Sequence, residues 1–524
     1  MKKILLLLLI PFISFSQNID KLFGEKGEIY FSFKYNNKSQ LDEISNIISL
    51  DHKTNSEMAY AYANRSEFQN FLKIGIDYKL INKKPINFIN NSSGNWDYYP
   101  TYTEYTDMMQ TFANSFPDIC KLHNLGTLNS GREILIVQIS DNVGQKENEP
   151  SFLYTSSMHG DELAGYILSL RLIDHILNGY GNNPRLTGLV DNIDIWINPL
   201  ANPDGAYDHT PPSWPPNLPA GNTNEIDYPK RYNANNIDLN RNYPDPQDGP
   251  HPDGNSYQTE TNIFLGLADT VNFTISANMH SGVEVCNYPW DTWSTLTADD
   301  IWWQYVCTEY ADSCQENSSS GYFNSQNNGI TNGNDWYEVN GGRQDYMNYF
   351  RYCREFTLEL SNEKTPAPID LPTLWDANYP SLLNYIEQSL FGLRGIIKDS
   401  ITGNPLKARI EINNHDIDSS HIYSTLPIGN YHRYLYQGNY NVTFSKSGYY
   451  PKTINTSIFN NSSTIKDVQL APINLTPTYI SEEITNNKYN LLIDVLGRKK
   501  NPTKNTPILY IYNDETVEKI IIIE

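Results

Sequence analysis

His159 and Glu162, three residues apart in a His-Gly-Asp-Glu segment, are side chains whose types and spacing could bind a metal. They lie between an apolar stretch at 152–155, which predicts a strand, and a second apolar stretch that predicts a helix. At the start of a helix, residues at this spacing can face the same point. An imidazole and a carboxylate suit Zn²⁺, and a catalytic zinc has three protein ligands and an open position for water. His280, which follows the predicted strand 273–277, qualifies as the third ligand.

A His-x-x-Glu spacing alone is a weak signal, because a histidine at the start of a surface helix gives the same pattern. Further motifs accompany it in this chain. They are Asn-Pro-Leu-Ala-Asn-Pro-Asp-Gly at 198–205, Arg-Tyr-Asn-Ala-Asn-Asn-Ile-Asp-Leu-Asn-Arg-Asn-Tyr-Pro at 231–244, Gly-Gly-Arg-Gln-Asp-Tyr at 341–346 and Thr-Leu-Glu-Leu-Ser at 357–361. Each charged residue in them could by itself be a solvated loop residue or a turn former. Together and in this order, the motifs favour a catalytic site.

With these motifs the chain resembles the zinc metallocarboxypeptidases, most closely the regulatory N/E-type subgroup, over about 96–474. In that subgroup a transthyretin-like β-sandwich follows the catalytic domain. The resemblance implies one Zn²⁺ per catalytic domain, with His159, Glu162 and His280 as its ligands. It also implies that Asp238 accepts the other N–H of His159, a common arrangement around zinc histidines.

The resemblance also assigns the reacting groups. These are Glu359 as the general base, Arg231 as the partner of the developing oxyanion and Tyr337 as a mobile tyrosine that closes over the substrate. Asn240 and Arg241 would bind the free terminal carboxylate, and Gln344 is placed with them among the substrate-binding residues. The chemistry itself favours these types. Zinc lowers the pKa of a bound water to about 7, a carboxylate can pass its proton to the leaving amine, and a guanidinium matches a carboxylate in two hydrogen bonds.

Asp291 lies eleven residues after His280, in Asn-Tyr-Pro-Trp-Asp. It resembles the acidic residue with which N/E-type enzymes hold a terminal Lys or Arg, so we expect a preference for basic C-terminal residues. Arg343 stands where related enzymes usually carry an apolar residue, and in the pocket it could neutralise Asp291 or admit acidic side chains. The alternative is that Asp291 is a solvated loop charge. Cys286 is expected to be a buried or disulfide-bonded cysteine, because no base is placed to activate it.

The elements that position these residues predict an α/β fold. Residues 96–390 contain apolar strand candidates at 134–139, 152–155, 193–197, 273–277 and 356–360 and a helix at 163–177. The polar residues cluster directly after the strands, which is where ligands bind in open α/β sheets. By resemblance, the fold is an α/β/α sandwich with a mixed sheet.

The pattern along the chain predicts five segments. They are a signal peptide at 1–17, a small N-terminal α/β domain at 18–95, the zinc carboxypeptidase catalytic domain at 96–390, a transthyretin-like β-sandwich at 391–474 and a C-terminal sorting domain at 475–524. The last segment, with Leu-Gly-Arg at 496–498 between alternating strands, resembles the tail domain read by the type IX secretion system of Bacteroidetes. Its alternative reading is a further small β-domain. We therefore expect a protein that is secreted or held at the cell surface, exported through the periplasm.

Composition argues against a nucleic-acid-binding protein, a membrane-spanning protein and a fold built mainly on disulfides. Lys and Arg number 38 against 60 Asp and Glu, a net charge of −22 that disfavours nucleic acid as a partner. The apolar run at 4–13 is too short to cross a bilayer, so no membrane span is expected. Five cysteines allow at most two disulfides.

The sequence thus predicts a secreted zinc carboxypeptidase that removes the C-terminal residue of peptides or proteins. Two alternatives stay open. One is a cell-wall peptide hydrolase on the same scaffold, and the other is a secreted binding protein without catalysis. Asn240 and Arg241 favour an ordinary terminal carboxylate over a cell-wall peptide, and a complete set of ligands and base disfavours the binding protein.

Overall fold

The computed structural model describes residues 23, 27–81, 95–207, 224–226, 228–319, 321–473, 491–499, 501, 505–511 and 517–521. The chain divides into two compact units, Met1–Pro472 and Ile473–Glu524. The expected signal peptide at 1–17 lies outside the described residues.

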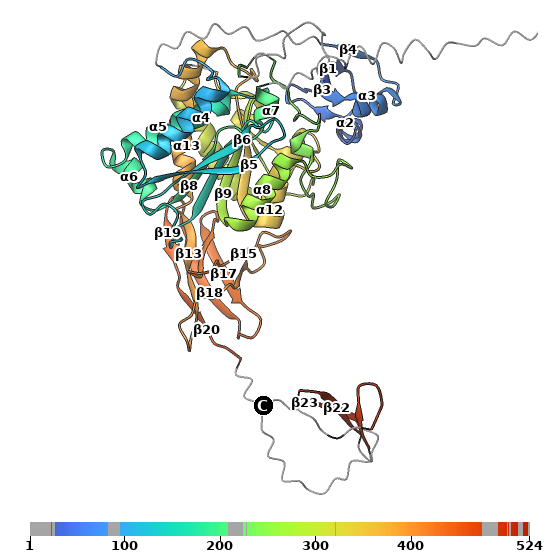
Figure 1. Cartoon of the computed structure of the whole chain (residues 1–524), viewed down its shortest axis with the longest axis vertical. Helices are drawn as coiled ribbons and strands as arrows, with labels where there is room; N and C mark the ends of the chain where they lie inside the picture. Colours follow the sequence, from blue (N-terminus) through green and yellow to red (C-terminus); the bar gives the residue numbers. More distant parts are fainter. Residues whose placement is uncertain are drawn as a thin grey trace, which may run out of the picture. The chain divides into compact units, whose positions relative to one another are not determined.

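An eight-stranded sheet forms the centre of the first unit, with the strand order β11-β10-β12-β9-β7-β8-β6-β5 (Figure 1). Its strands are β5 (Cys120–Thr127), β6 (Glu133–Ile139), β7 (Ser151–Ser156), β8 (Asp194–Asn198), β9 (Phe273–His280), β10 (Glu284–Tyr288), β11 (Ile330–Asn332) and β12 (Arg354–Leu360). Strands β8, β7, β9 and β12 are parallel neighbours. The antiparallel pairs are β5 with β6, β6 with β8 and β10 with β12. The predicted α/β fold with a mixed sheet is confirmed.

Helices cover both faces of this sheet. On one side lie α4 (Tyr102–Ser115), α5 (Ala164–Gly179), α6 (Pro184–Val190), α9 (Asp300–Glu316) and α13 (Leu371–Gln388), and on the other lie α8 (Thr259–Thr270) and α12 (Arg343–Arg351). Successive residues of a strand point to opposite faces. Accordingly, Phe152 and Tyr154 of β7 belong to the first apolar core and Leu153 to the second. Every residue of β7, β9 and β12 is buried, as expected for strands that are covered on both faces.

Residues 28–80, called the N-terminal domain below, form an antiparallel sheet of order β2-β3-β1-β4 with two helices. Its elements are β1 (Glu28–Phe33), α2 (Lys38–Ser45), β2 (Ser49–Leu50), β3 (Ala59–Asn64), α3 (Arg65–Leu72) and β4 (Tyr78–Leu80). The helix that begins at Lys38 is short, because α2 ends at Ser45. Ser49 and Leu50 instead pair with Tyr62 and Ala61 of β3. This short strand depends on a partner that is distant in sequence.

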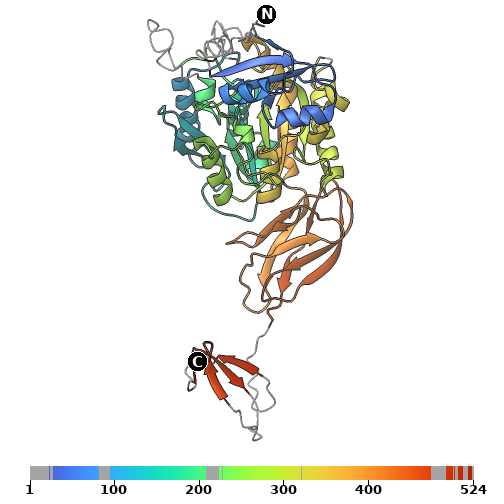
Figure 2. The same ribbon diagram turned by 90° about the vertical axis from the view of Figure 1, so that its right-hand side faces the viewer.

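A β-sandwich follows α13 (Figure 2). One sheet contains β16 (Asn430–Arg433), β13 (Gly392–Asp399), β19 (Ser463–Ile465) and β20 (Val468–Leu470), and the other contains β15 (Ile422–Tyr423), β14 (Arg409–Ile412), β17 (Gly438–Ser445) and β18 (Lys452–Ile458). Inward residues of both sheets, including Leu393, Ile410, Val442 and Phe444, form one apolar core.

The second unit has a three-stranded antiparallel sheet in the order β21 (Leu491–Asp494), β22 (Pro507–Ile511), β23 (Val517–Ile521). After β21, Gly497 adopts a positive φ of 78° and Arg498 Nε donates to Asp494 Oδ2 at 2.9 Å. The Leu-Gly-Arg segment is therefore a turn, as the sequence predicted.

Two further features concern the whole chain. All five cysteines are buried and free, so Cys286 is a buried thiol and not a disulfide partner. Among the described residues, we find no helix whose length and apolar character would let it cross a membrane.

Candidate metal centre and active site

The side chains of His159, Glu162 and His280 converge on one point and are fully buried. His159 Nδ1 is 3.1 Å from Glu162 Oε1 and 3.1 Å from His280 Nδ1. Glu162 Oε2 is 2.7 Å from His280 Nδ1. Two imidazole nitrogens and one carboxylate are the donor set of a catalytic zinc site, in which a water is the further ligand. The residues therefore fit Zn²⁺.

Neighbouring strand ends bring these ligands together. β7 and β9 are parallel, and Ser156 at the end of β7 pairs with Met279, which precedes His280. His159 and Glu162 lie in the connection between β7 and α5, just before the helix begins at Ala164. Gly160 is required in this turn, because a Cβ there would overlap with the backbone of Gly205. The carboxyl end of the sheet thus carries the metal cluster, as the sequence predicted.

The other nitrogen of each histidine ring is also held. His159 Nε2 is 3.0 Å from Asp238 Oδ1, and His280 Nε2 is 2.7 Å from Asn278 Nδ2. Asp238 Oδ2 accepts a second hydrogen bond from Arg231 Nε at 3.0 Å. Burial opposes ionisation of Asp238, but the charges of Arg231 and His159 hold its pKa well below the usual range. An ionised Asp238 orients the His159 ring with Nδ1 toward the metal position.

Glu359 ends β12, beside the metal cluster. β12 is parallel to β9, and Glu359 is the direct neighbour of His280 across the two strands. The side chain is buried; Oε1 is in contact with His52 Nδ1, and Oε2 has no hydrogen-bond partner within the described residues. Burial raises the pKa of the Glu359 carboxyl to about 8, partly offset by His280. A bound Zn²⁺ would act in the opposite direction through its charge. Such a carboxylate is suited to proton transfer near neutral pH.

Two cations lie next to the ligands. Arg231 Nη1 is 3.1 Å from His159 Nδ1 and 3.4 Å from Glu162 Oε1. Lys364 Nζ is 2.5 Å from the same oxygen of Glu162. Arg231 was expected near the metal, whereas Lys364 was not identified from the sequence. The one sequence feature that could have indicated Lys364 is its position, five residues after Glu359 in the segment that follows β12.

Arg241 offers a buried guanidinium with free donors. Its Nη1 donates to the carbonyl of Asn240 at 2.9 Å, while Nε and Nη2 are buried and have no partner within the described chain. Buried donors of this kind are normally satisfied, so these two point to a ligand such as a carboxylate. The backbone N–H of Asn240 donates to Asp238 Oδ1 at 2.8 Å. Asp238 therefore positions Arg241 relative to the metal cluster.

Asp291 is buried, with 3 % of its surface exposed, and is not a solvated loop charge. Its Oδ1 accepts from Gln344 Nε2 at 3.0 Å and from Asn287 Nδ2 at 3.2 Å. A Cβ at Gly342 would lie 3.5 Å from Asp291 Oδ2 and 3.8 Å from Asn240 Oδ1, so Gly342 lies between the two groups. Burial raises the pKa of Asp291 to about 7.

Gln344 and Arg343 are both engaged with the protein. Gln344 Oε1 accepts from the backbone N–H of Thr357 at 2.7 Å, so its amide joins β12 to Asp291. Arg343 is directed away from Asp291. Its Nη2 is 3.0 Å from Glu355 Oε2 and its Nη1 contacts Thr155 Oγ1. The possibility that Arg343 neutralises Asp291 is therefore wrong, because Glu355 already holds its guanidinium.

Tyr337 and a residue that the sequence did not single out, His52, lie at the boundary with the N-terminal domain. Tyr337 is 3 % exposed and belongs to the apolar core of that domain. His52 Nδ1 contacts Glu359 Oε1. No motif marks His52, because its position depends on how two separately folded segments pack.

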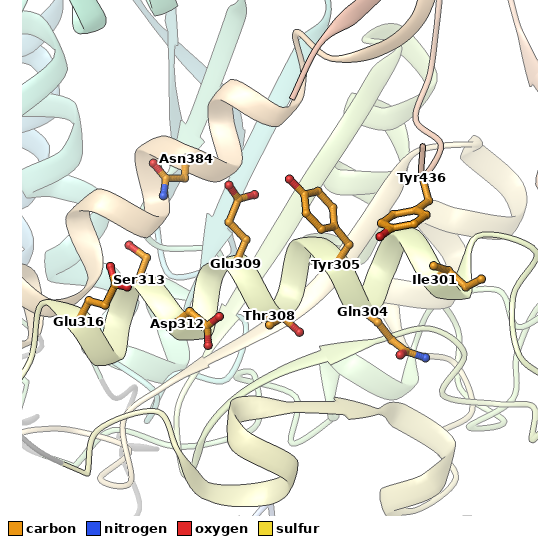
Figure 3. Close-up of a pocket in the computed structure, with 10 residues that line it drawn as sticks. All are labelled: Ile301, Gln304, Tyr305, Thr308, Glu309, Asp312, Ser313, Glu316, Asn384 and Tyr436. Carbon is orange, nitrogen blue, oxygen red and sulfur yellow. The ribbon is translucent and has the colours of Figure 1, made fainter. Parts of the chain in front are cut away.

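A separate surface groove of about 610 Å³ runs along α9 and has no part in this centre. Tyr305, Glu309 and Asp312 of α9 face it, together with Asn384 of α13 and Tyr436 of the β-sandwich (Figure 3). None of the residues that line this groove belongs to the His159-Glu162-His280 cluster.

The comparisons with known proteins agree with this geometry. The family model "Zinc carboxypeptidase" matches residues 105–381, just over half of the chain. Human carboxypeptidase D is 35 % identical over 368 residues, covering 67 % of this chain but only 25 % of that protein. The catalytic chain of rat carboxypeptidase N is 33 % identical over 405 residues, covering 70 % and 85 %. The crystal structure of carboxypeptidase A from Helicoverpa armigera has a TM-score of 0.52 at 18 % identity, covers 69 % and 97 %, and shares the fold. The chain belongs to the zinc carboxypeptidase family.

Proposed function

We propose that this chain is a secreted zinc carboxypeptidase that hydrolyses the C-terminal peptide bond of peptides or proteins and prefers basic C-terminal residues. The observation that carries the proposal is the combination of a buried His-Glu-His cluster with an adjacent carboxylate and an unsatisfied guanidinium. The cluster and the carboxylate suit hydrolysis, and the guanidinium suits recognition of a chain terminus.

In the mechanism we propose, His159, Glu162 and His280 hold Zn²⁺, which when bound supplies a water of lowered pKa. Glu359 takes the proton of the attacking water at its carboxylate and then donates it to the nitrogen of the leaving residue. Arg231 lies close enough to the ligands to stabilise the negative charge that develops on the carbonyl oxygen.

Arg241 and Asn240 give the reaction its exopeptidase character. The free Nε and Nη2 groups of Arg241 would donate hydrogen bonds to the two oxygens of a terminal carboxylate. An internal peptide bond has no such group, so it would leave the buried donors unsatisfied. This requirement favours a carboxypeptidase over an endopeptidase and over a binding protein without catalysis.

Asp291 is the basis for the proposed side-chain preference. A buried carboxylate opposite a Lys or Arg side chain makes a strong, charge-assisted contact. The same carboxylate facing an apolar side chain would stay unpaired, at a cost of several kcal/mol. Gln344 and Asn287 would hold the carboxylate in position for this contact.

We also propose that the β-sandwich over 391–474 is a transthyretin-like domain and that the tail at 475–524 is a type IX sorting domain. The sandwich is supported by its two four-stranded sheets and the tail by its turn at Leu496–Arg498 between antiparallel strands. Together with the charged and apolar segments at 1–17, the tail supports export.

Mass spectrometry of a mixed peptide pool tests the activity. Zinc-loaded protein should shorten peptides with free C-termini by single residues, with Lys and Arg removed fastest, while a chelated sample and C-terminally amidated peptides should stay intact. Cleavage confined to cell-wall peptides would favour the alternative hydrolase, and binding without cleavage would favour a binding protein.

A further inference from the structure

A groove of about 470 Å³ on the β-sandwich, called the basic groove below, is distant in sequence from every residue of the metal centre. It is lined by basic and aromatic side chains, which include Lys407, Arg409, Lys446, Tyr423 and Tyr449. None of the described residues that line it is acidic. The chain as a whole has a net charge of −22. Three cations in one groove are therefore a local exception on an acidic protein.

The sheet that contains β15, β14, β17 and β18 places these side chains on one face (Figure 1). In the antiparallel register, Arg409 of β14 lies opposite Tyr423 of β15 on one side and opposite Ser445 of β17 on the other. Directly opposed residues of antiparallel strands point to the same face of a sheet. Ile410, the next residue of β14, is buried in the core of the sandwich, so Arg409 and its two neighbours face outward.

The three cations lie close to this row of side chains. Lys407 Nζ is 5.8 Å from the centroid of the Tyr423 ring, within the range of a cation–π contact. Lys446 Nζ donates to the backbone carbonyl of Lys407 at 3.1 Å. Arg409 Nη2 is 3.2 Å from Glu411 Oε2, while its Nε has no partner within the described chain. Glu411 offsets one of the three positive charges, and the groove keeps a net positive charge.

The aromatic rings of the basic groove are held in place by their neighbours. The rings of Tyr352 and His421 meet the half-buried Tyr423 at 64° and 76°, with centroids 5.2 Å and 5.3 Å away. Tyr449 donates its hydroxyl to Asp399 Oδ2 at 2.8 Å. A rigid tyrosine offers a large contact area at a low cost in conformational entropy. Sugar rings pack their C–H faces against aromatic rings of this kind, so a sugar unit on Tyr423 would have a cation beside it.

We propose that the basic groove binds an acidic polysaccharide, with its carboxylate or sulfate groups on Lys407, Arg409 and Lys446 and a sugar ring on Tyr423. The cations alone would suit any polyanion, and the tyrosine beside them favours a sugar chain over an acidic peptide. Duplex nucleic acid carries one charge per about 1.7 Å. The negative charge of the rest of the chain would repel it more strongly than a polysaccharide with one charge per sugar unit.

This inference concerns a site outside the metal centre and does not depend on the proposed hydrolysis. Binding at the groove would retain the protein on a surface rich in acidic polysaccharide. Electrostatic contacts at an exposed site are screened by salt, so the affinity should fall as the ionic strength rises.

Affinity electrophoresis of the full chain tests the proposal, in native gels that contain polygalacturonate, dextran sulfate or neutral dextran. The wild-type chain should be retarded by one or both acidic polysaccharides and not by neutral dextran, and added NaCl should weaken the retardation. The comparison of polygalacturonate with dextran sulfate distinguishes carboxylate from sulfate groups as the preferred ligand. Soluble polyglutamate, added as a competitor, tests an acidic peptide as the occupant.

Variants locate the binding in the basic groove, and circular dichroism of each one checks that it is folded. Arg409→Ala should weaken binding about tenfold or more, the loss expected for one charge-assisted hydrogen bond. Lys446→Ala should act in the same direction. Tyr423→Ala should also weaken binding, whereas Tyr423→Phe keeps the ring and should bind like wild type. Lys398→Ala is the matched control, because it removes an exposed lysine from β13 in the other sheet of the sandwich and should leave binding unchanged.

Three results would overturn the proposal. The first is no retardation by either acidic polysaccharide. The second is equal retardation of wild type, Arg409→Ala and Lys446→Ala, which would place any binding elsewhere on the chain. The third is competition by polyglutamate at the same concentration of charge together with an unchanged Tyr423→Ala, which would identify an acidic polypeptide as the occupant.

Discussion

Replacing Arg241 by alanine tests how the chain recognises a C-terminus. The Nε and Nη2 groups of Arg241 are buried and lack partners among the described residues, so a substrate carboxylate gains both hydrogen bonds without breaking others. Hydrogen bonds to charged groups contribute about 1.5–3 kcal/mol each. Two of them amount to about 3–6 kcal/mol, which corresponds to a loss in kcat/KM of about 10²- to 10⁴-fold.

The assay compares one peptide as its free acid and as its C-terminal amide, with the full chain loaded with zinc. Wild-type protein should strongly favour the acid, and Arg241→Ala should lose activity on the acid while changing little on the amide. Arg241→Lys should fall between them, because an ammonium keeps the charge but not the paired geometry. Arg185→Ala, which removes an exposed guanidinium paired with Glu387, serves as the control.

Two results would refute this reasoning. One is an Arg241→Ala variant with wild-type kcat/KM on the free acid. The other is an equal loss on acid and amide, which would indicate general disruption of the site through Asp238 and not a lost carboxylate contact.

Three other predictions concern specificity, stability and export. Asp291→Ala should abolish the preference for terminal Arg over Phe. In wild-type protein this preference should decline as the pH falls below about 7, because the raised pKa of Asp291 leaves its carboxyl neutral there. A pH series of kcat/KM for peptides ending in Arg and in Phe measures both effects. Arg433→Ala should lower the free energy of unfolding by about 3–5 kcal/mol, because it removes a cation that lies 2.8 Å from the buried carboxylate of Asp299. Arg409→Ala removes one partner of an exposed ion pair and should cost less than about 1 kcal/mol. Thermal unfolding of the two variants measures this difference. Removing 476–524 should leave peptide hydrolysis intact but keep the protein in the periplasm of a host with the type IX pathway, and a truncated protein found in the medium would contradict the proposed sorting role.

The sequence predicted the strands that carry the metal cluster because they are buried on both faces. The stretches 152–155 and 273–277 contain apolar or small residues with only Thr and Ser as polar members and no charge, so their positions could be recognised without a structure. The edge strand β5 was not predicted, since four of its residues are half-buried, three are exposed, and polar residues interrupt it. Periodicity identifies strands by burial, and edge strands lack this signal.

The residues of the candidate active site also divide into those that the sequence could identify and those that it could not. His159, Glu162, His280 and Glu359 lie in motifs, so their types and order could be read directly. The orientation of Arg343 could not, because it depends on Glu355, which the sequence did not link to it. Contacts between distant segments are set by packing, which local patterns do not encode.

His52 is the clearest example of such a contact. It reaches Glu359 from a segment more than 300 residues earlier in the chain. The sequence suggested a small α/β domain there, but nothing in its pattern could place one of its turns over the catalytic centre.

The most direct test of the central claim is the zinc content and turnover of Glu359→Gln, compared with His159→Ala, both made in the full chain. Glu359→Gln should bind one zinc per chain and lose about 10²- to 10⁴-fold in kcat, because it removes the proposed base but no ligand. His159→Ala should lose the metal itself. Loss of zinc in Glu359→Gln, or turnover equal to wild type, would contradict the assignment of Glu359 as the base beside a His159-Glu162-His280 zinc site.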